Sequence, residues 1–305
     1  KSMQIGPKNI MIAGTLKCRR AARGSNRVSG VISKLTSQDA RSKASWHFFW
    51  IPFLLLCGLA SFMPVSAGSA EISDVLGTTS IQANQTRWTL AVKSRDIAML
   101  SDLLDAGYLG VNSATEKGKT ALMVAAQAAS RLLCVDLVAL GADVGAKNKN
   151  GGTPLMHAAV GGDLDIVNLL LREGAEVNER ASNGWSALML ASAKGFSQIV
   201  KRLIQVNGEL NSRDIFGWTP LMHAVEQNRM KVIELLVSTS DSHINSRNID
   251  GVTALHRAAA LGYIKIVRVL LVAGARADLS DQTGRTAVDY AMESGNLQIA
   301  KELSN

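Results

Sequence analysis

The chain has 305 residues, a formal net charge of +8, three cysteines and only 5% aromatic residues. The net positive charge lies at one end, because residues 1–67 carry ten Lys or Arg and a single acid, Asp39. The remainder carries 23 basic and 24 acidic residues, so it lacks the basic stripe that a nucleic acid partner requires. The cysteines are too few for a disulfide framework.

The first segment is a basic leader followed by an apolar run. Residues 1–45 are basic, Ser-rich and nearly free of acids, and the sixteen residues from Phe48 to Met63 are almost wholly apolar. A helix of that length spans about 24 Å, which is shorter than the roughly 30 Å hydrocarbon core of a bilayer. Small residues then precede two cleavage points, after Ala67 and after Ala70, a pattern typical of an export signal.

We therefore expect residues 1–70 to be a leader that is poorly ordered or removed, residues 71–85 to be a linker, and residues 86–305 to be the folded domain. Positive charge before the apolar run would send the folded domain across the membrane, so the expected location is periplasmic or secreted. One alternative is an uncleaved leader, which would be the chain's only membrane contact. Another is an organellar transit peptide followed by an inner-membrane anchor, because the leader is rich in Arg and Ser.

A four-residue phrase recurs along the rest of the chain at steps of 33, 33, 33, 34 and 33 residues. Its first residues are Thr120, Thr153, Ser186, Thr219, Thr253 and Thr286. A Gly lies two residues before each phrase, and an Ala lies five residues after its first residue. A constant period of this size predicts a stack in which each unit completes its core only against its neighbours.

Each unit is predicted to be a turn followed by two antiparallel helices. The Gly supplies the turn, and the Thr or Ser caps the first helix. Pro154 and Pro220 stand at the first helical position, where no needed N–H donor is lost. The second helix carries apolar residues at helical spacing, as in residues 164–171, and a closing glycine such as Gly174 ends it.

This frame resembles the ankyrin repeat, whose Thr-Pro-Leu-His phrase and length of 33 residues both match over residues 86–305. A degenerate unit precedes the six regular ones, with Trp88 in the Leu column and Asn84 in the turn Gly column. In the His column only His256 remains, and Met replaces it in four units. The resemblance implies an all-α ankyrin-repeat solenoid of stacked helix-turn-helix units with protruding turns.

The sequence contains no recognisable catalytic set. His157 and His223 share a column two repeats apart, which places them about 20 Å apart in a stack, too far to hold one metal ion. His256 is interpreted as a hydrogen-bonding residue of the repeat frame, and Cys134 as a buried thiol in a core column. We therefore expect no catalytic residues, no metal and no cofactor, and no enzyme activity.

In ankyrin-like stacks the residue before the phrase lies on the protruding turn and faces the concave side. Two adjacent units place a Trp at this position, and apolar residues on nearby turns and first helices extend the cluster between basic residues. The predicted partner-binding residues are Trp185, Ile215, Phe216, Trp218, Ile249, Val252, Leu261, Lys119, Lys149 and Arg285. In the alternative interpretation, the two Trp rings pack against the next turn, as is common in such repeats.

The sequence thus predicts an exported, monomeric ankyrin-repeat protein that binds another protein, of unknown identity, through its concave face and turns. One alternative is a membrane-tethered ankyrin scaffold with an uncleaved N-terminal anchor. Another is a non-catalytic regulatory subunit of an enzyme. The Trp218→Ala substitution is expected to weaken partner capture without shifting the melting curve if Trp218 contacts the partner, and to do the reverse if it only packs.

Overall fold

The computed structural model describes residues 68–239 and 243–304, so the predicted leader lies almost entirely outside the described residues. The described part contains fourteen helices. Their bounds are α2 (Gly68–Ser94), α3 (Ile97–Asp105), α4 (Ala121–Gln127), α5 (Arg131–Ala139), α6 (Pro154–Gly161), α7 (Leu164–Arg172), α8 (Ala187–Lys194), α9 (Ser197–Gln205), α10 (Pro220–Glu226), α11 (Met230–Val237), α12 (Ala254–Ala260), α13 (Ile264–Val272), α14 (Ala287–Glu293) and α15 (Leu297–Leu303).

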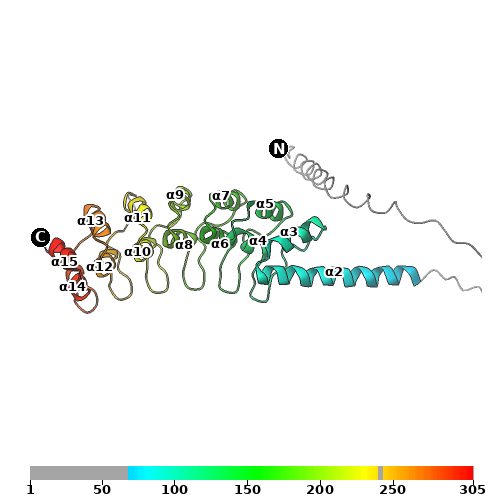
Figure 1. The fold of residues 1–305 in the computed structure, drawn as a ribbon, viewed down its shortest axis with the longest axis horizontal. Helices are drawn as coiled ribbons and strands as arrows, with labels where there is room; N and C mark the ends of the chain where they lie inside the picture. Colours follow the sequence, from blue (N-terminus) through cyan, green and yellow to red (C-terminus); the bar gives the residue numbers. More distant parts are fainter. Residues whose placement is uncertain (1–67, 240–242, 305) are drawn as a thin grey trace, which may run out of the picture. The chain divides into compact units, whose positions relative to one another are not determined.

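These helices stack in pairs, in two layers, with the turns protruding along one edge (Figure 1). The first helices of the regular units, α4, α6, α8, α10, α12 and α14, lie beside the turns, and the second helices form the other layer. Each first helix packs on the first helix of the next unit and on its own second helix. The all-α solenoid predicted from the 33-residue period is confirmed.

Each regular unit begins with the side-chain cap that the phrase predicts. The Oγ1 atom of Thr120 accepts a hydrogen bond from the backbone N–H of Met123 at 3.4 Å. The equivalent contact is made by Thr153, Ser186, Thr219, Thr253 and Thr286. His256 adds its own frame bonds, because its Nδ1 atom accepts from the backbone N–H of Thr253 at 3.2 Å. Each first helix therefore starts at a defined residue, which fixes where its turn protrudes.

The core runs the length of the stack as rows of small and aliphatic side chains. The Ala column of the phrase is fully buried in all six regular units. Gly161 shows how closely the first helices approach, since a Cβ at this position would lie 2.3 Å from the backbone oxygen of Ala126. Small residues in these columns therefore set the spacing of the units and hold neighbouring turns close to one another.

Neighbouring turns are joined by backbone hydrogen bonds that the sequence patterns did not predict. In each case an N–H group of one turn donates to a carbonyl of the preceding turn. The donor–acceptor pairs are Lys149–Lys117 (3.0 Å), Ser182–Asn150 (2.8 Å), Ile215–Asn183 (3.2 Å), Ile249–Phe216 (3.1 Å) and Gln282–Asp250 (2.9 Å). Six consecutive turns thereby form one continuous edge, which we call the turn row.

The N-terminal unit differs from the predicted boundaries. Its first helix, α2, runs without a break from Gly68 to Ser94, so residues 71–85, expected to be a linker, lie within a helix. Trp88 is fully buried and packs on Tyr108, with 4.8 Å between the ring centroids. The large indole therefore fills the end of the core in place of the usual Leu.

None of the helices in the described residues is long and apolar enough to cross a membrane. The apolar run from Phe48 to Met63, on which the export and anchor predictions depend, lies outside those residues.

Candidate protein-binding groove

In three units a polar residue at the start of the turn contacts the first-helix residue nine positions later. We call this contact the turn-to-helix clamp. The clamped pairs, with the distance between their polar atoms, are Asn148–His157 (3.4 Å), Asp214–His223 (3.0 Å) and Asp281–Tyr290 (2.9 Å). The first member of each pair also accepts backbone N–H groups within its own turn, as Asp214 does from Phe216 and Trp218. The clamp therefore ties the turn to the helix with polar contacts, and its side chains can still line a recess, as Asn148 and His157 do.

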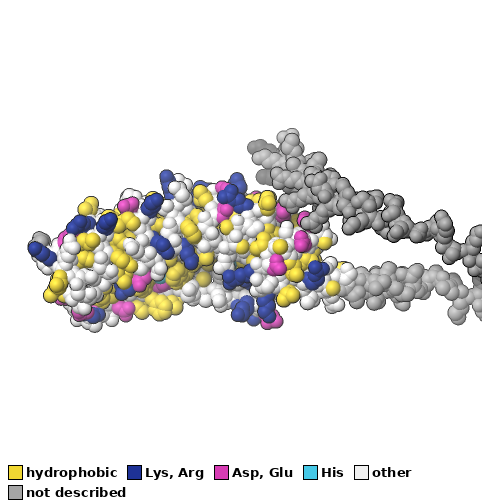
Figure 2. Space-filling model, viewed as in Figure 1, with side chains coloured by type: hydrophobic (Ala, Val, Ile, Leu, Met, Phe, Trp, Pro, Cys, Tyr) yellow, Lys and Arg dark blue, Asp and Glu magenta, His cyan; other side chains and the backbone are white. Residues whose placement is uncertain are grey.

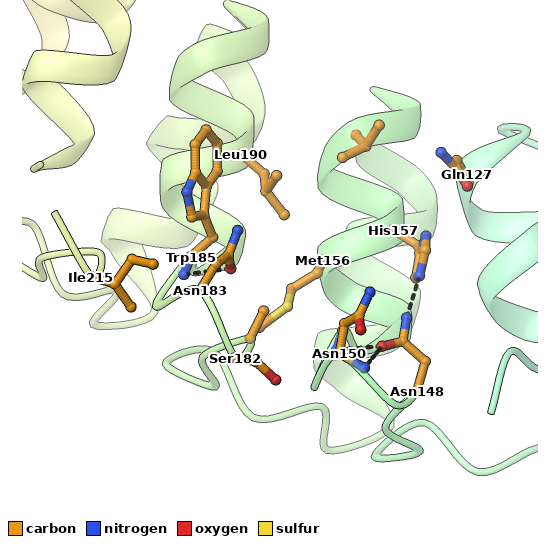
Figure 3. Close-up of a pocket in the computed structure, with 13 residues that line it drawn as sticks. Gln127, Asn148, Asn150, Met156, His157, Ser182, Asn183, Trp185, Leu190 and Ile215 are labelled. Atoms are coloured by element: carbon orange, nitrogen blue, oxygen red, sulfur yellow. Dashed lines mark hydrogen bonds between the residues drawn. The ribbon is translucent and has the colours of Figure 1, made fainter. Parts of the chain in front are cut away.

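The unit between the first two clamped ones has no clamp, because Ala181 and Leu190 occupy the two columns. Neither side chain can form a hydrogen bond, so no side-chain contact of this kind joins this turn to α8. Both residues line a cavity of about 690 Å³, which is drawn in Figure 3. They give the cavity an apolar wall, and the clamped pair Asn148 and His157 lines it as well.

This cavity collects side chains from three consecutive first helices and the turns beside them (Figure 3). We call it the Trp185 groove and define it by Gln127, Met156, His157, Trp185, Leu190 and Ile215. Gln127 ends α4, and Met156 and His157 belong to α6, the helix in the middle of the groove. Trp185 and Ile215 come from two adjacent turns, which the turn row holds together.

The two tryptophans predicted to bind a partner flank one histidine. The His223 ring lies 4.2 Å from the Trp185 ring and 5.4 Å from the Trp218 ring, between centroids. The Arg257 guanidinium lies 5.7 Å from the Trp218 ring centroid, and it donates hydrogen bonds to both carboxylate oxygens of Glu226. Both indoles are half-buried, so each packs within the stack and still presents part of its ring.

The apolar residues predicted on the turns differ in exposure. Ile215, Phe216 and Ile249 are 58%, 56% and 53% exposed, whereas Val252 is 8% exposed and offers little surface. Leu261, at the end of α12, is half-buried. Figure 2 shows hydrophobic side chains on the turn edge beneath α10, and basic side chains on the same edge beneath α4 and α6. The turn row therefore carries an apolar part and a basic part.

Basic side chains border the groove on its N-terminal side. The Lys119 ammonium donates to Oε1 of Gln127 at 3.3 Å, and burial, together with nearby Arg95, lowers the pKa of Lys119. Burial, with added repulsion from Lys119 and Arg95, lowers the pKa of His157 to about 4, so this ring is neutral at pH 7. No ion pair within the described residues joins Arg95, Lys119 or Lys149 to a carboxylate.

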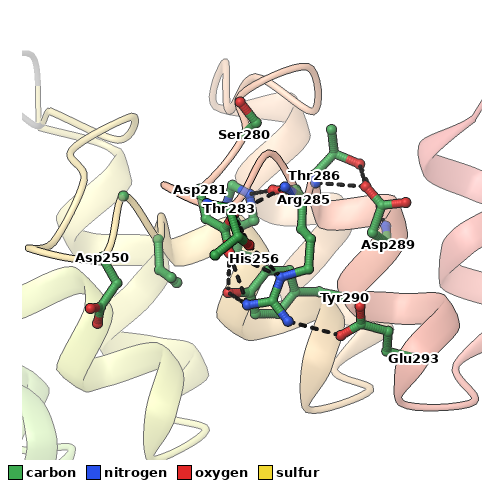
Figure 4. A network of polar contacts seen from close by, with 12 residues as sticks. Asp250, His256, Ser280, Asp281, Thr283, Arg285, Thr286, Asp289, Tyr290 and Glu293 are labelled. Atoms are coloured by element: carbon green, nitrogen blue, oxygen red, sulfur yellow. Dashed lines mark hydrogen bonds and ion pairs between the residues drawn. The ribbon is translucent and has the colours of Figure 1, made fainter.

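Arg285, also predicted to flank the partner site, is instead held within the last unit (Figure 4). Its guanidinium pairs with Asp281 at 3.0 Å and with Glu293 at 3.1 Å. Burial alone would raise the pKa of Asp281, but hydrogen bonds from Thr283, from the Arg285 backbone and from Tyr290 outweigh it and hold that pKa well below its usual range. The acidic and basic groups of this clamp therefore neutralise each other.

Nothing in the described part of the chain forms a group of three or more His, Cys, Asp or Glu side chains that could hold a metal ion. Cys134 is fully buried, as its core column predicts, and burial raises the pKa of its thiol to about 12. A thiol in this state is protonated at pH 7 and is a poor nucleophile.

The partner-binding residues predicted from the sequence do not include several residues of the groove. Gln127, Met156, His157 and Leu190 were not selected, because apolar or polar residues on a first helix are normal frame residues in every unit. A usable signal was present in the columns, since Ala181 and Leu190 are both apolar where two neighbouring units hold a hydrogen-bonding pair. Comparison of units would have shown this departure from the two neighbouring units, although not the cavity itself.

The chain is similar to one family of known proteins and to two curated relatives. The family described as ankyrin repeats (3 copies) matches residues 88–181, 127–214, 155–248, 188–280 and 240–305, which together cover more than half of the chain. Ankyrin repeat domain-containing protein 49 of Bos taurus and that of Homo sapiens are each 42% identical over 50 residues, or 16% of this chain. The chain spans about a fifth of the length of these curated relatives, 21% in both cases.

Among solved structures, the chain resembles one chain of the complex between the predatory endopeptidase Bd0816 from Bdellovibrio bacteriovorus and the immunity protein Bd3460. The two are 32% identical with a TM-score of 0.56, and the match covers 62% of this chain and 98% of that chain.

Proposed function

Because the chain belongs to the ankyrin-repeat family, we propose that it is an exported, monomeric binding protein that recognises another protein through its concave face and turns. Ankyrin-repeat proteins are generally non-catalytic binding modules. The observation that carries the finer proposal is the Trp185 groove beside the exposed turn residues Ile215 and Phe216. Contiguous apolar surface of this kind, bordered by charged residues, is typical of a protein-binding site.

The rigidity of the turn row also supports recognition by the turns. Backbone hydrogen bonds between turns restrain the apolar side chains before any partner arrives. A surface that is already ordered loses less conformational entropy on binding, which favours affinity. Recognition would then need little rearrangement of the backbone.

Paired substitutions on the surface test this proposal. Ile215→Ser combined with Phe216→Ser removes two exposed apolar side chains, and Val272→Ser removes one that is 91% exposed on α13, away from the turns. We expect the double variant to lose about tenfold or more in partner capture with an unchanged melting curve, and the control to bind as the parent does. Equal capture by all three proteins would refute the proposal.

Export is proposed from the basic leader, the apolar run and the small residues before the two cleavage points. The test is N-terminal sequencing of the chain recovered from cells. A mature chain that starts at Gly68 or at Glu71 supports export, whereas a full-length chain in the membrane fraction supports the tethered scaffold.

A second candidate function is the regulation of an enzyme by binding to it. It is favoured by the solved complex, which pairs an endopeptidase with an immunity protein and contains a chain similar to this one. In this case the captured partner would be an enzyme whose activity falls as the purified chain is added. An enzyme partner with unchanged turnover at saturating chain would exclude regulation and leave simple binding.

A further inference from the structure

We infer that the Trp185 groove receives an acidic segment of the partner, with one aliphatic or aromatic side chain in the groove and carboxylates beside Lys119 and Lys149. This inference rests on the proposed protein-binding function and names the chemistry of what is bound.

The apolar half of the inference follows from the missing clamp. Ala181 and Leu190 leave a space bounded by Met156 and Trp185, and the cavity of about 690 Å³ is large enough for one bulky side chain. Water in this space finds few hydrogen-bonding groups on the Leu190 side, so its replacement by an apolar side chain is favourable. An anchor of this kind in a preformed recess is a common mode of peptide recognition.

The acidic half follows from the position of the basic groups. Lys119 reaches Gln127, which lines the groove, at 3.3 Å. The charge of Lys119 therefore lies close to the groove, in agreement with its part in lowering the pKa of His157, another lining residue. Lys149 stands between two lining asparagines on the turn. A carboxylate placed among these groups would relieve the repulsion between the cations.

A basic segment would find fewer partners here. Of the acids on the nearby turns, Glu116 is exposed, but Glu179 pairs with Lys147 at 2.7 Å and Asp214 is buried against His223. Farther along, Glu226 is bound by the Arg257 guanidinium. The chain's own residues 1–67 have the same sign of charge as this border, so charge complementarity disfavours them as the occupant.

The test uses the full chain and labelled peptides of about twelve residues, with one phenylalanine flanked by glutamates. Matched peptides carry lysines in place of the glutamates, or serine in place of the phenylalanine. Fluorescence anisotropy is expected to show that the Glu–Phe peptide binds about tenfold or more tightly than either matched peptide, and that added salt weakens it. Equal binding of the lysine peptide would overturn the acidic assignment, and equal binding of the serine peptide would overturn the anchor.

Charge-reversal variants test whether the peptide binds at the groove or at the basic leader, because the leader is the same in every protein tested. Lys119→Glu and Lys149→Glu each reverse one charge at the groove, and Lys265→Glu makes the same change at an exposed position on α13. We expect a loss of about tenfold for the first two and less than about twofold for the control. Lys149 is exposed, so its variant decides the outcome if Lys119→Glu fails to fold. Equal losses in all three would overturn the inference.

A further variant changes the wall of the groove. Ala181→Asn with Leu190→His introduces the pair that the preceding unit holds at Asn148 and His157. This variant is expected to fold and to lose peptide binding by about tenfold, because polar side chains would replace the apolar wall against which the anchor packs. Unchanged binding would place the peptide elsewhere on the chain.

Photo-crosslinking locates the anchor directly. With benzoylphenylalanine at the anchor position, the label is expected on residues 148–160 or 181–190, as mapped by mass spectrometry. Labelling confined to residues 1–67 would overturn the inference. If no peptide binds but the Ile215→Ser, Phe216→Ser protein still loses its partner, only the acidic assignment fails. If partner capture is also unaffected, the proposed function fails with it.

Discussion

The last unit and the unit of the Trp185 groove are built on the same frame, yet one has the turn-to-helix clamp and the other lacks it. In the last unit, Asp281 is bound by Tyr290 and by Arg285, so the turn is tied to α14 by charged and polar contacts. In the other unit, Ala181 and Leu190 leave the corresponding space empty of polar contacts. The unit of α8 thus adopts the repeat fold without a clamp, and its two clamp columns hold side chains that line the groove.

The largest expected effect comes from breaking a clamp. Asp214→Ala gives the unit of α10 the residue that the groove unit has at Ala181, and it removes the acceptor for His223 and for two backbone N–H groups. We expect the free energy of unfolding to fall by about 2–4 kcal/mol, measured by urea denaturation. A loss below about 0.5 kcal/mol would mean that the clamp contributes little to stability.

The second effect concerns pH and the neutral histidine of the groove. Because the pKa of His157 is about 4 in the folded chain and about 6.5 when unfolded, the unfolded state binds more protons between these values. Stability from this group is therefore complete above about pH 6.5 and is lost as pH falls towards 4, by about 1–3 kcal/mol. The measurement is urea denaturation across this range.

His157→Leu is the matched control for the pH effect, since Leu190 occupies this column in the next unit. The variant should be less sensitive to acid than the parent over the same range, while titrations elsewhere in the chain remain common to both proteins. An identical pH dependence in the two proteins would show that His157 does not carry the effect.

A smaller effect is expected from adding a clamp to the unit that lacks one. Ala181→Asn with Leu190→His should raise the free energy of unfolding by about 1 kcal/mol, because one hydrogen-bonding pair is added at a half-buried site. Thermal or urea unfolding measures this gain. A destabilised variant would indicate that Leu190 contributes more by packing than the added pair contributes by hydrogen bonding.

The smallest expected effect compares two basic residues that the sequence analysis placed at the same site. Lys149→Gln should weaken binding of the acidic peptide by about threefold, whereas Arg285→Gln should leave it unchanged, because Arg285 is already paired with Asp281 and Glu293. Peptide titrations of both variants measure the difference. Equal losses of peptide binding would show that the ion pairs with Asp281 and Glu293 do not prevent Arg285 from contacting the peptide.

The repeat frame was predictable because each of its positions depends on chemistry close by in the sequence. Thr153 caps the helix that follows it directly, and Gly217 adopts a positive φ of 77° in its own turn. The start of α2 was not predictable in the same way. Residues 71–85 lack the repeat pattern and were interpreted as a linker, although no proline interrupts residues 68–94 and the structure places a continuous helix there.

The groove was only partly predictable, because it depends on residues from several units and on contacts that are missing. Trp185 and Ile215 were selected as apolar residues on protruding turns, and both line the groove. Leu190 was not selected, since its role depends on the absence of a partner at Ala181. Arg285 looked available because its contacts with Tyr290 and Glu293 form only when the turn packs against α14.

The turn row presents contact points at a regular distance to any partner that lies along it. Backbone hydrogen bonds between neighbouring turns fix the spacing from one turn to the next. Packed helices in successive units lie about 8–10 Å apart. An extended polypeptide advances about 3.3 Å per residue, so roughly every third residue of such a partner would contact the next turn. A partner sequence whose contact residues recur at every third position would therefore match the spacing of the turns.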